Sequence, residues 1–194
     1  MTEEARPEKI RLFVAVGLPQ EIKKQLQQLQ EQLRKFALDA KWVKSEGIHL
    51  TLKFLGYVPK EKIPSITDEL KGAAKGCGVF SIRLKGCGFF PNARRPSVFW
   101  CGLDCDKLGS LQQEIDNRLA ALDFEKETRP FSAHLTLARF RDPHGLFWLA
   151  KEVEKIKDSD WGQFPAKEIT LYQSILHRTG AEYRALETFP LGLE

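Results

Sequence analysis

The tetrapeptide His-Leu-Thr-Leu occurs twice in this chain, at residues 49–52 and at residues 134–137. Side chains of a β-strand alternate between its two faces, so the histidine and threonine of each copy share one face and the leucines share the other. The leucines suit burial in a hydrophobic layer, whereas packing alone has no need for a histidine at the same place twice. Each copy therefore predicts a strand with one apolar face and one face available for chemistry.

The sequence around both copies follows one order of elements: strand, helix, strand, helix and strand. In the first half, an apolar run at 11–16 precedes a helix whose apolar positions recur at helical spacing, at Ile22, Leu26, Leu29, Leu33 and Phe36. In the second half, a run at 97–103 precedes a helix with the same periodicity, at Leu108, Leu111, Ile115, Leu119 and Leu122. The repeated order indicates two related halves.

The rest of each half is predicted from the same patterns. A short extended piece at 41–43 precedes the first copy, and a helix over about 60–74 and an extended run at 79–90 follow it. After the second copy we expect a helix across 145–156 and two extended runs, at 164–176 and 183–191. Thr179-Gly180 predicts a hairpin turn between these last two runs.

The spacing supports a duplicated unit within one domain over residues 1–194. Arg11 precedes His49 by 38 residues, and Val98 precedes His134 by 36. We place the junction at 91–97, which gives repeat-like halves at about 8–92 and 96–192. Alternating strands and helices also fit a parallel doubly wound sheet. No glycine-rich phosphate loop follows a strand, however, and the final hairpin favours antiparallel pairing. We therefore predict an α+β fold with two similar lobes of antiparallel sheet that face each other.

Composition and charge exclude some classes of protein. A hydrophobic fraction of 42% supplies a substantial core and argues against disorder. The longest apolar run, at 12–18, is far shorter than the ~20 residues that cross a bilayer. The polar amino terminus does not resemble a secretory signal, so we expect a cytoplasmic protein without a membrane partner. A net charge of +4 is compatible with a phosphate-bearing ligand but is also ordinary for a solvated surface.

The cysteines and histidines do not predict a metal site. The four cysteines, which lack the Cys-x-x-Cys spacing of zinc sites, are Cys77, Cys87, Cys101 and Cys105. Cys101 and Cys105 could form a metal-binding pair only if one strand ran long enough to place both on the same face. We favour reduced, partly buried thiols instead. His144 and His177 lie in an expected loop and near an expected turn, and we expect both to face solvent. We therefore predict no metal and no cofactor.

Two His-x-Thr pairs that line one cleft suit phosphoryl chemistry without a metal. Histidine has an unperturbed pKa of about 6.5, so one ring can accept a proton while the other donates one, and each transfer is typically worth ~10²–10⁴ in rate. The pairs are His49 with Thr51 and His134 with Thr136; the hydroxyls can donate hydrogen bonds to nonbridging oxygens. Arg139 could bind the same phosphate. Strict alternation would point it away from His134, so a twist, a bulge or a long reach is required.

Both motifs, with their flanking residues, resemble the paired His-x-Thr signatures of the two-histidine (2H) phosphoesterases. The motif stretches are HLTLKFLG at 49–56 and HLTLARF at 134–140. Within this superfamily the chain resembles the bacterial and archaeal RNA 2′,3′-cyclic phosphodiesterases, also called 2′-5′ RNA ligases. The further stretches that carry this likeness are RLFVAVGLP at 11–19, KWV at 41–43 and ILHRTGAEYRALETFPL at 175–191. The likeness covers nearly the whole chain.

The resemblance implies a bilobal fold with a central cleft and a hydrolase that needs no metal. Such enzymes open an RNA 2′,3′-cyclic phosphate, expel the 3′-oxygen and leave a 2′-phosphate, and several also join RNA ends through a reversible 2′-5′ linkage without ATP. Carried over by position, His49 and His134 are the catalytic pair, and Thr51, Thr136 and Arg139 bind the phosphate. We expect His49 to be the proton donor and His134 the acceptor, although the near symmetry of the motifs leaves the direction open.

The substrate and its further contacts leave alternatives open. We expect an RNA or oligonucleotide with a 2′,3′-cyclic phosphate end as the partner, and a monomer with no obligate protein partner. Aromatic rings and cations that could hold a single-stranded end are, by position, Phe13, Trp42, Phe54 and Arg94 or Arg95. Packing and solvation also explain these residues. The alternatives are a phosphodiesterase for 2′-5′ oligoadenylate or a small cyclic-phosphate metabolite, and an RNA- or nucleotide-binding module without turnover.

Overall fold

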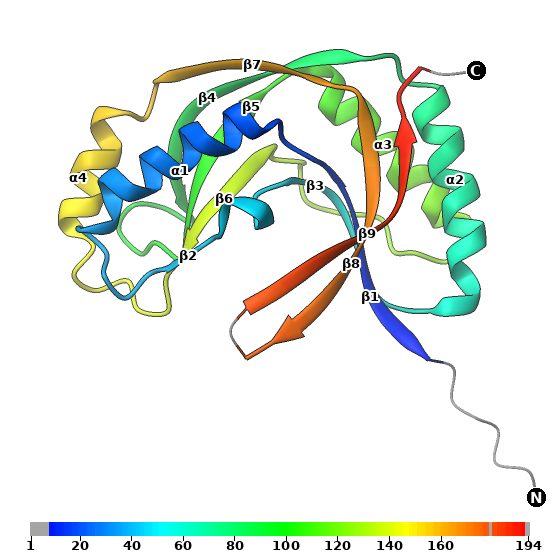
Figure 1. Ribbon diagram of the computed structural model, residues 1–194, viewed down its shortest axis with the longest axis horizontal. Helices are drawn as coiled ribbons and strands as arrows, with labels where there is room; N and C mark the ends of the chain where they lie inside the picture. The colour runs from blue at the N-terminus through cyan, green and yellow to red at the C-terminus, as the bar shows by residue number, and fades with distance from the viewer. Residues whose placement is uncertain (1–7, 179, 193–194) are drawn as a thin grey trace, which may run out of the picture.

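The protein is described by a computed structural model over residues 8–178 and 180–192, and its centre is one antiparallel sheet (Figure 1). Within these residues the strands are ordered β7-β4-β5-β6-β3-β1-β8-β9, and β2 pairs with β6. The strands are β1 Lys9–Val16, β2 Lys41–Trp42, β3 Leu50–Pro59, β4 Phe80–Phe90, β5 Val98–Asp104, β6 His134–Arg139, β7 Asp160–Ala166, β8 Glu168–His177 and β9 Gly180–Pro190. The antiparallel pairing excludes the doubly wound alternative.

The helices form the outer layer. They are α1 Gln20–Arg34, α2 Ile63–Lys75, α3 Asp106–Ala120 and α4 Phe147–Lys155, with 3-10 turns η1 Ser45–Gly47 and η2 Lys60–Lys62. The apolar stripes predicted for the two longest helices are buried at Ile22, Leu26, Leu29, Leu33, Leu108, Leu111, Ile115 and Leu119. The last predicted position of each stripe, Phe36 or Leu122, lies just beyond the end of its helix and is half-buried. The described helices include none that is long and apolar enough to cross a membrane.

The sheet divides into two lobes that join at β3 and β6. One lobe, the α2–α3 lobe, contains β3, β1, β8 and β9, and the helices α2 and α3 pack on it. The other, the α1–α4 lobe, contains β6, β5, β4, β7 and β2, and α1 and α4 pack on it. Figure 1 shows the two helix pairs at opposite ends of the molecule. The predicted α+β fold with two lobes is confirmed.

The lobes do not coincide with the two halves of the sequence. The strand order is symmetric about the β6–β3 boundary, so that β3, β1, β8 and β9 correspond to β6, β5, β4 and β7. Each half nevertheless supplies strands to both lobes: β1 and β3 belong to one lobe, whereas β4 belongs to the other. The helix α1 also crosses over, because Gln30 Nε2 donates to the carbonyl of Leu137 on β6 at 2.8 Å. The junction at 91–97 and the halves 8–92 and 96–192 stay predictions.

Two predicted elements differ in detail. The run expected at 164–176 is two strands, β7 and β8, which break at Lys167 and pair in different lobes. The first turn of the helix expected from residue 60 is η2, and α2 begins only at Ile63. The β8–β9 hairpin is present, with His177 opposite Gly180, and Thr179 of its expected turn lies outside the described residues.

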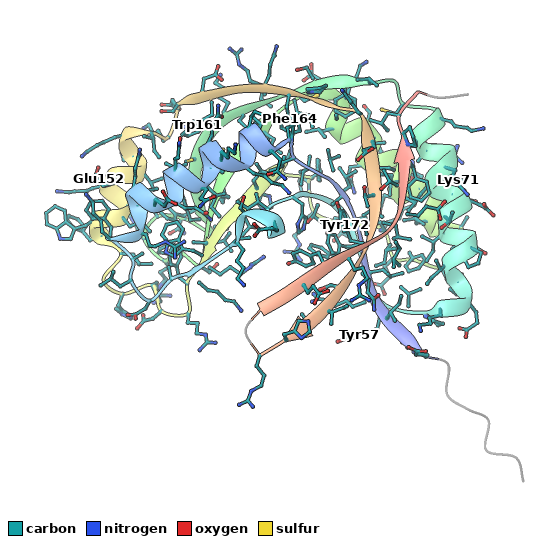
Figure 2. All side chains as sticks on the ribbon, viewed as in Figure 1. Tyr57, Lys71, Glu152, Trp161, Phe164 and Tyr172 are labelled. Carbon is teal, nitrogen blue, oxygen red and sulfur yellow. The ribbon has the colours of Figure 1, made fainter. Side chains whose placement is uncertain are left out.

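Side chains from both lobes fill the space between sheet and helices; Figure 2 draws all of them and labels Phe164 of β7, which is 2% exposed. The four motif leucines are all buried in this core, at Leu50, Leu52, Leu135 and Leu137. The cysteines are free thiols as expected, with Cys87 and Cys101 buried and Cys77 and Cys105 half-buried. The leucines thus hold the motif strands against the helices and leave the histidine face outward.

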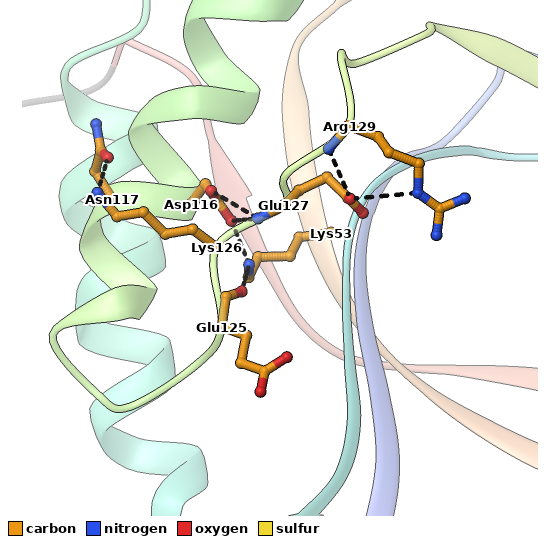
Figure 3. Close-up of polar contacts among 7 residues, drawn as sticks. All are labelled: Lys53, Asp116, Asn117, Glu125, Lys126, Glu127 and Arg129. Carbon is orange, nitrogen blue, oxygen red and sulfur yellow. Dashed lines mark hydrogen bonds and ion pairs between the residues drawn. The ribbon is translucent and has the colours of Figure 1, made fainter.

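One buried ion pair links the first motif strand to α3 (Figure 3). Lys53 of β3 is paired with Asp116, and their side chains are only 6% and 9% exposed. Lys53 Nζ also donates to the carbonyl of Glu125 at 2.7 Å, and the backbone N–H of Glu127 donates to Asp116 Oδ2 at 3.2 Å. These contacts tie β3 to the loop that follows α3 and leads to the second motif.

We predict that Asp116→Leu lowers the free energy of unfolding by about 3–5 kcal/mol, because it leaves the Lys53 ammonium buried without a counter-charge. Urea unfolding followed by circular dichroism measures the loss. The double variant Lys53→Met/Asp116→Leu should recover most of the stability, because both charges are then replaced by apolar groups.

The control is Asp123→Asn, which removes the carboxylate of an exposed ion pair with Lys62. It should change the free energy of unfolding by less than about 1 kcal/mol. Equal losses in Asp116→Leu and in the double variant would show that the pairing of the two charges is not what stabilises this contact.

Candidate functional site

The two motif strands face each other at the boundary between the lobes. Strands β3 and β6 pair antiparallel through Leu50 and Leu135. His49 and Thr51 flank Leu50 in the chain, and His134 and Thr136 flank Leu135, so this pair brings both motifs to the lobe boundary. All four side chains line one cleft with a volume of about 460 Å³. The structure therefore brings the two His-x-Thr pairs together as the sequence predicted.

A β-bulge in each motif strand turns an additional side chain into the cleft. In β6, Thr136 lies opposite Trp100, but the next paired residue is Ala138, opposite Phe99. The extra residue reverses the alternation, so that Arg139 lines the same cleft as Thr136. Strict alternation would point Arg139 away from the cleft, and the bulge is the irregularity that turns its side chain back.

The same irregularity occurs in β3. There Thr51 lies opposite Ala15 and Lys53 opposite Val14. Lys53 consequently turns towards α3, where it meets Asp116, while Phe54 turns into the cleft. Phe54 and Arg139 occupy equivalent places in the two motifs, so one half-site presents an aromatic ring where the other presents a cation.

The ring of His49 is packed on several sides. Its Nδ1 lies 2.8 Å from the carbonyl oxygen of Gly47, which can only accept a hydrogen bond. The proton of the neutral ring is therefore on Nδ1, and Nε2 is left as the atom that can exchange a proton. Phe13 stacks on the ring with centroids 4.8 Å apart, and Tyr183 meets it edge-on at 4.9 Å.

Burial lowers the pKa of His49 to about 4, because the charged ring loses its hydration. The hydrogen bond to Gly47 opposes this shift, whereas the positive charges of Lys23 and Arg139 add to it. His49 is consequently neutral near pH 7 in the ligand-free cleft. A phosphate anion beside the ring would raise this pKa, since an opposite charge favours the protonated form.

His134 is held in a similar way on the other side. Its Nδ1 donates to the carbonyl of Ser132 at 2.7 Å, and the ring of Phe90 meets it edge-on at 4.9 Å. Each histidine thus bonds through Nδ1 to a carbonyl two residues earlier, which fixes its orientation and leaves Nε2 available. The shared geometry matches the shared sequence.

Several other residues that line the cleft were not identified as site residues from the sequence. Beyond the motif side chains, Phe13, Phe54 and Arg139, the lining residues are Arg11, Leu12, Val43, Gly47, Ser174, Ala181 and Tyr183. Arg11 could have been found, because alternation along β1 places it on the face of Phe13. Tyr183 and Ser174 could not, since their strands come from the far end of the chain and are brought in by the sheet.

The candidate substrate contacts have different outcomes. Phe54 is 65% exposed and available to a base, whereas Phe13 is 2% exposed and serves packing. Trp42 lines a neighbouring cavity. Arg94 and Arg95 lie on an exposed turn, where their backbone N–H groups donate to Asn92, and neither lines the two cavities.

The remaining histidines are exposed, as expected. The side chain of His144 is 89% exposed beside Asp142, and that of His177 is 49% exposed beside Glu182. In the part of the chain that the structure describes, no three His, Cys, Asp or Glu side chains are grouped to hold a metal ion.

Comparison with known proteins identifies a family. The family model described as "LigT like Phosphoesterase" matches residues 16–100 and 104–183. An RNA 2′,3′-cyclic phosphodiesterase of Methanocaldococcus jannaschii is 36% identical over 178 residues, which cover 92% of this chain and 99% of that protein.

Solved structures agree with this result. A crystal structure of a Thermus thermophilus protein superposes with a TM-score of 0.80 at 29% identity, covering 94% of this chain and 98% of that one. E. coli LigT in complex with 3′-AMP superposes with a TM-score of 0.75 at 25% identity, covering 96% of this chain and all of that one.

We predict that His49 is half-protonated at about pH 4 in the ligand-free protein, and that Tyr183→Ser raises this value towards 6.5 by admitting water to the ring. Nuclear magnetic resonance titration of the imidazole carbons measures both values. Tyr57→Ser is the matched control, because Tyr57 is 65% exposed and lines neither cavity. A wild-type value near 6.5 would contradict burial as the governing effect.

Proposed function

Because this chain belongs to the LigT-like phosphoesterase family, we propose that it is a phosphodiesterase that hydrolyses RNA 2′,3′-cyclic phosphate ends to 2′-phosphate ends. The observation that carries this proposal is the set of two His-x-Thr pairs around one cleft. Relatives named RNA 2′,3′-cyclic phosphodiesterase and the binding of 3′-AMP by E. coli LigT support the substrate class.

The reaction needs one proton removed and one proton supplied. A water oxygen attacks phosphorus as the bond from phosphorus to the 3′-oxygen breaks, and the 2′-ester remains. One histidine takes the proton from water through Nε2, and the other gives a proton to the departing 3′-oxygen. Placement of His49 and His134 on opposite strands suits attack and departure on opposite sides of the phosphorus.

The phosphate is held by groups that donate hydrogen bonds. The hydroxyls of Thr51 and Thr136 donate to its nonbridging oxygens, and Arg139 supplies a fixed positive charge at the edge of the cleft. The negative charge that builds on these oxygens in the transition state strengthens all three contacts. These roles need no metal and no cofactor.

The direction of proton transfer is proposed with His49 as the donor and His134 as the acceptor. In the ligand-free cleft the low pKa of His49 favours the opposite assignment, because a neutral ring is ready to accept. Donation by His49 therefore requires the bound phosphate to raise its pKa. A substrate with sulfur in place of the 3′-oxygen separates the two assignments, since a thiolate leaves without protonation.

The same groups can serve a parallel transfer in which an alcohol takes the place of water. If the 5′-hydroxyl of a second RNA replaces water, its attack on phosphorus expels the 3′-oxygen and forms a 2′-5′ linkage without ATP. Ligation is included in the proposal as a secondary activity.

A monomer without an obligate protein partner and a cytoplasmic location stay predictions.

Two alternatives are distinguished by experiment. A phosphodiesterase for 2′-5′ oligoadenylate or for a small cyclic-phosphate metabolite would use the same histidines but prefer that substrate over a cyclic-phosphate RNA. A binding module without turnover would have no use for two histidines whose Nε2 atoms are both left available.

We predict that His49→Ala and His134→Ala each lower the kcat for a cyclic-phosphate oligonucleotide by at least ~10², because each removes one proton transfer. His144→Ala and His177→Ala, which change exposed histidines, should retain wild-type rates and serve as controls. The 3′-thio substrate should restore His49→Ala towards the wild-type rate and leave His134→Ala slow. Restoration of His134→Ala alone would reverse the assignment, and wild-type rates in both variants would exclude the mechanism.

We also predict that the RNA product carries a 2′-phosphate and that its rate of formation is unchanged by a metal chelator. End-group analysis with a general phosphatase and with an enzyme that removes only 3′-phosphates identifies the product. The same assay with excess EDTA tests whether the rate depends on a metal. A 3′-phosphate product would contradict expulsion of the 3′-oxygen. Loss of activity that zinc or magnesium restores would indicate a metallohydrolase.

A further inference from the structure

A second cavity of about 640 Å³ opens beside the catalytic cleft. The residues that line both are Val43, Gly47, Arg139, Ala181 and Tyr183. The catalytic roles proposed above use only the smaller cleft and leave this larger space unassigned. Because the two share a wall, a ligand that begins at the histidines can continue into it.

Segments from both lobes enclose the second cavity. One wall is β2 with the turn η1, and the other is the tip of the β8–β9 hairpin, which projects from the rest of the sheet in Figure 1. Lys41 of β2 extends its side chain towards the hairpin tip on the opposite wall. A Cβ added to Gly180 there would lie 4.0 Å from Lys41 Nζ. Tyr183 closes the inner end, since a Cβ on Gly47 would lie 3.5 Å from its ring.

The charges of this cavity favour an anion. Lys41 and Lys44 are exposed, and neither forms an ion pair with another of the described residues. Two carboxylates also line the cavity. Glu182 is already engaged by His177 at 3.1 Å and by Arg184 at 3.3 Å, which leaves Glu46 as the one negative charge that opposes the lysines. Arg139 at the shared wall adds a third cation.

The chemistry of the substrate specifies what can occupy this space. The cyclic phosphate ends the RNA at its 3′ side, so the strand can leave the catalytic cleft only through the 5′ side of the terminal nucleotide. A single strand is bound by cations along its backbone and by aromatic surfaces under its bases. The second cavity offers both, in the two lysines and in Trp42.

We propose that this cavity is a subsite for the nucleotide on the 5′ side of the terminal one, with Lys41 and Lys44 at its phosphate and Trp42 at its base. The inference rests on the proposed function and adds that the enzyme prefers an oligonucleotide to a mononucleotide. Lys41 and Lys44 therefore determine specificity and take no part in the proton transfers.

The test compares a ten-residue oligoribonucleotide that ends in a 2′,3′-cyclic phosphate with a 2′,3′-cyclic mononucleotide. The wild-type kcat/KM should be at least ~10-fold higher for the oligonucleotide, and Lys41→Ala/Lys44→Ala should lower that value by roughly 10-fold while changing the mononucleotide value less than about 2-fold. The dependence of the oligonucleotide rate on salt should also become weaker, because two contacts to phosphate are lost.

The matched control is Lys75→Ala/Lys107→Ala, which removes the same charge from exposed positions on α2 and α3 outside both cavities. It should leave both substrates at wild-type rates. Equal effects of the two double variants, or no wild-type preference for the oligonucleotide, would overturn the subsite and leave the proposed function intact. Absence of hydrolysis of either substrate by the wild type would instead overturn the proposed function.

Discussion

The two motif strands of this protein meet through a single pair of facing residues, Leu50 and Leu135, and the site depends on that contact. The leucines anchor the strands in the core of their lobes, and the alternation of strand side chains then presents histidine and threonine on the opposite face. The histidine and threonine of both motifs therefore line one cleft. A change in this register would separate the pairs.

The bulges adapt this symmetric frame to an asymmetric reaction. In both strands the residue after the last motif leucine is turned towards the helices and the following residue enters the cleft. One motif uses the first of these positions for Lys53, which is buried with Asp116, and the second for Phe54. The other motif has Ala138 and Arg139 at these places. The first copy thus supplies a buried lysine and an aromatic ring, whereas the second supplies a small buried residue and a cation.

The environments of the two histidines differ although their hydrogen bonds match. His49 is enclosed by aromatic rings from β1 and β9, which lowers its pKa, whereas the rings of Phe90 and Trp100 gather on the side of His134. The asymmetry comes from residues outside the motifs.

The sequence by itself determined most of the elements, the antiparallel α+β fold, the polar face of each His-x-Thr motif and the burial of the motif leucines, because periodicity and short motifs are local properties. It did not determine the bulges, since an irregular register arises only when two strands pair. The exchange of β4 for β8 and β9 between the lobes and the approach of Tyr183 to His49 were equally beyond local patterns. Contacts between segments more than a hundred residues apart depend on how the whole sheet closes, and they decided the protonation of His49 and the shape of the second cavity.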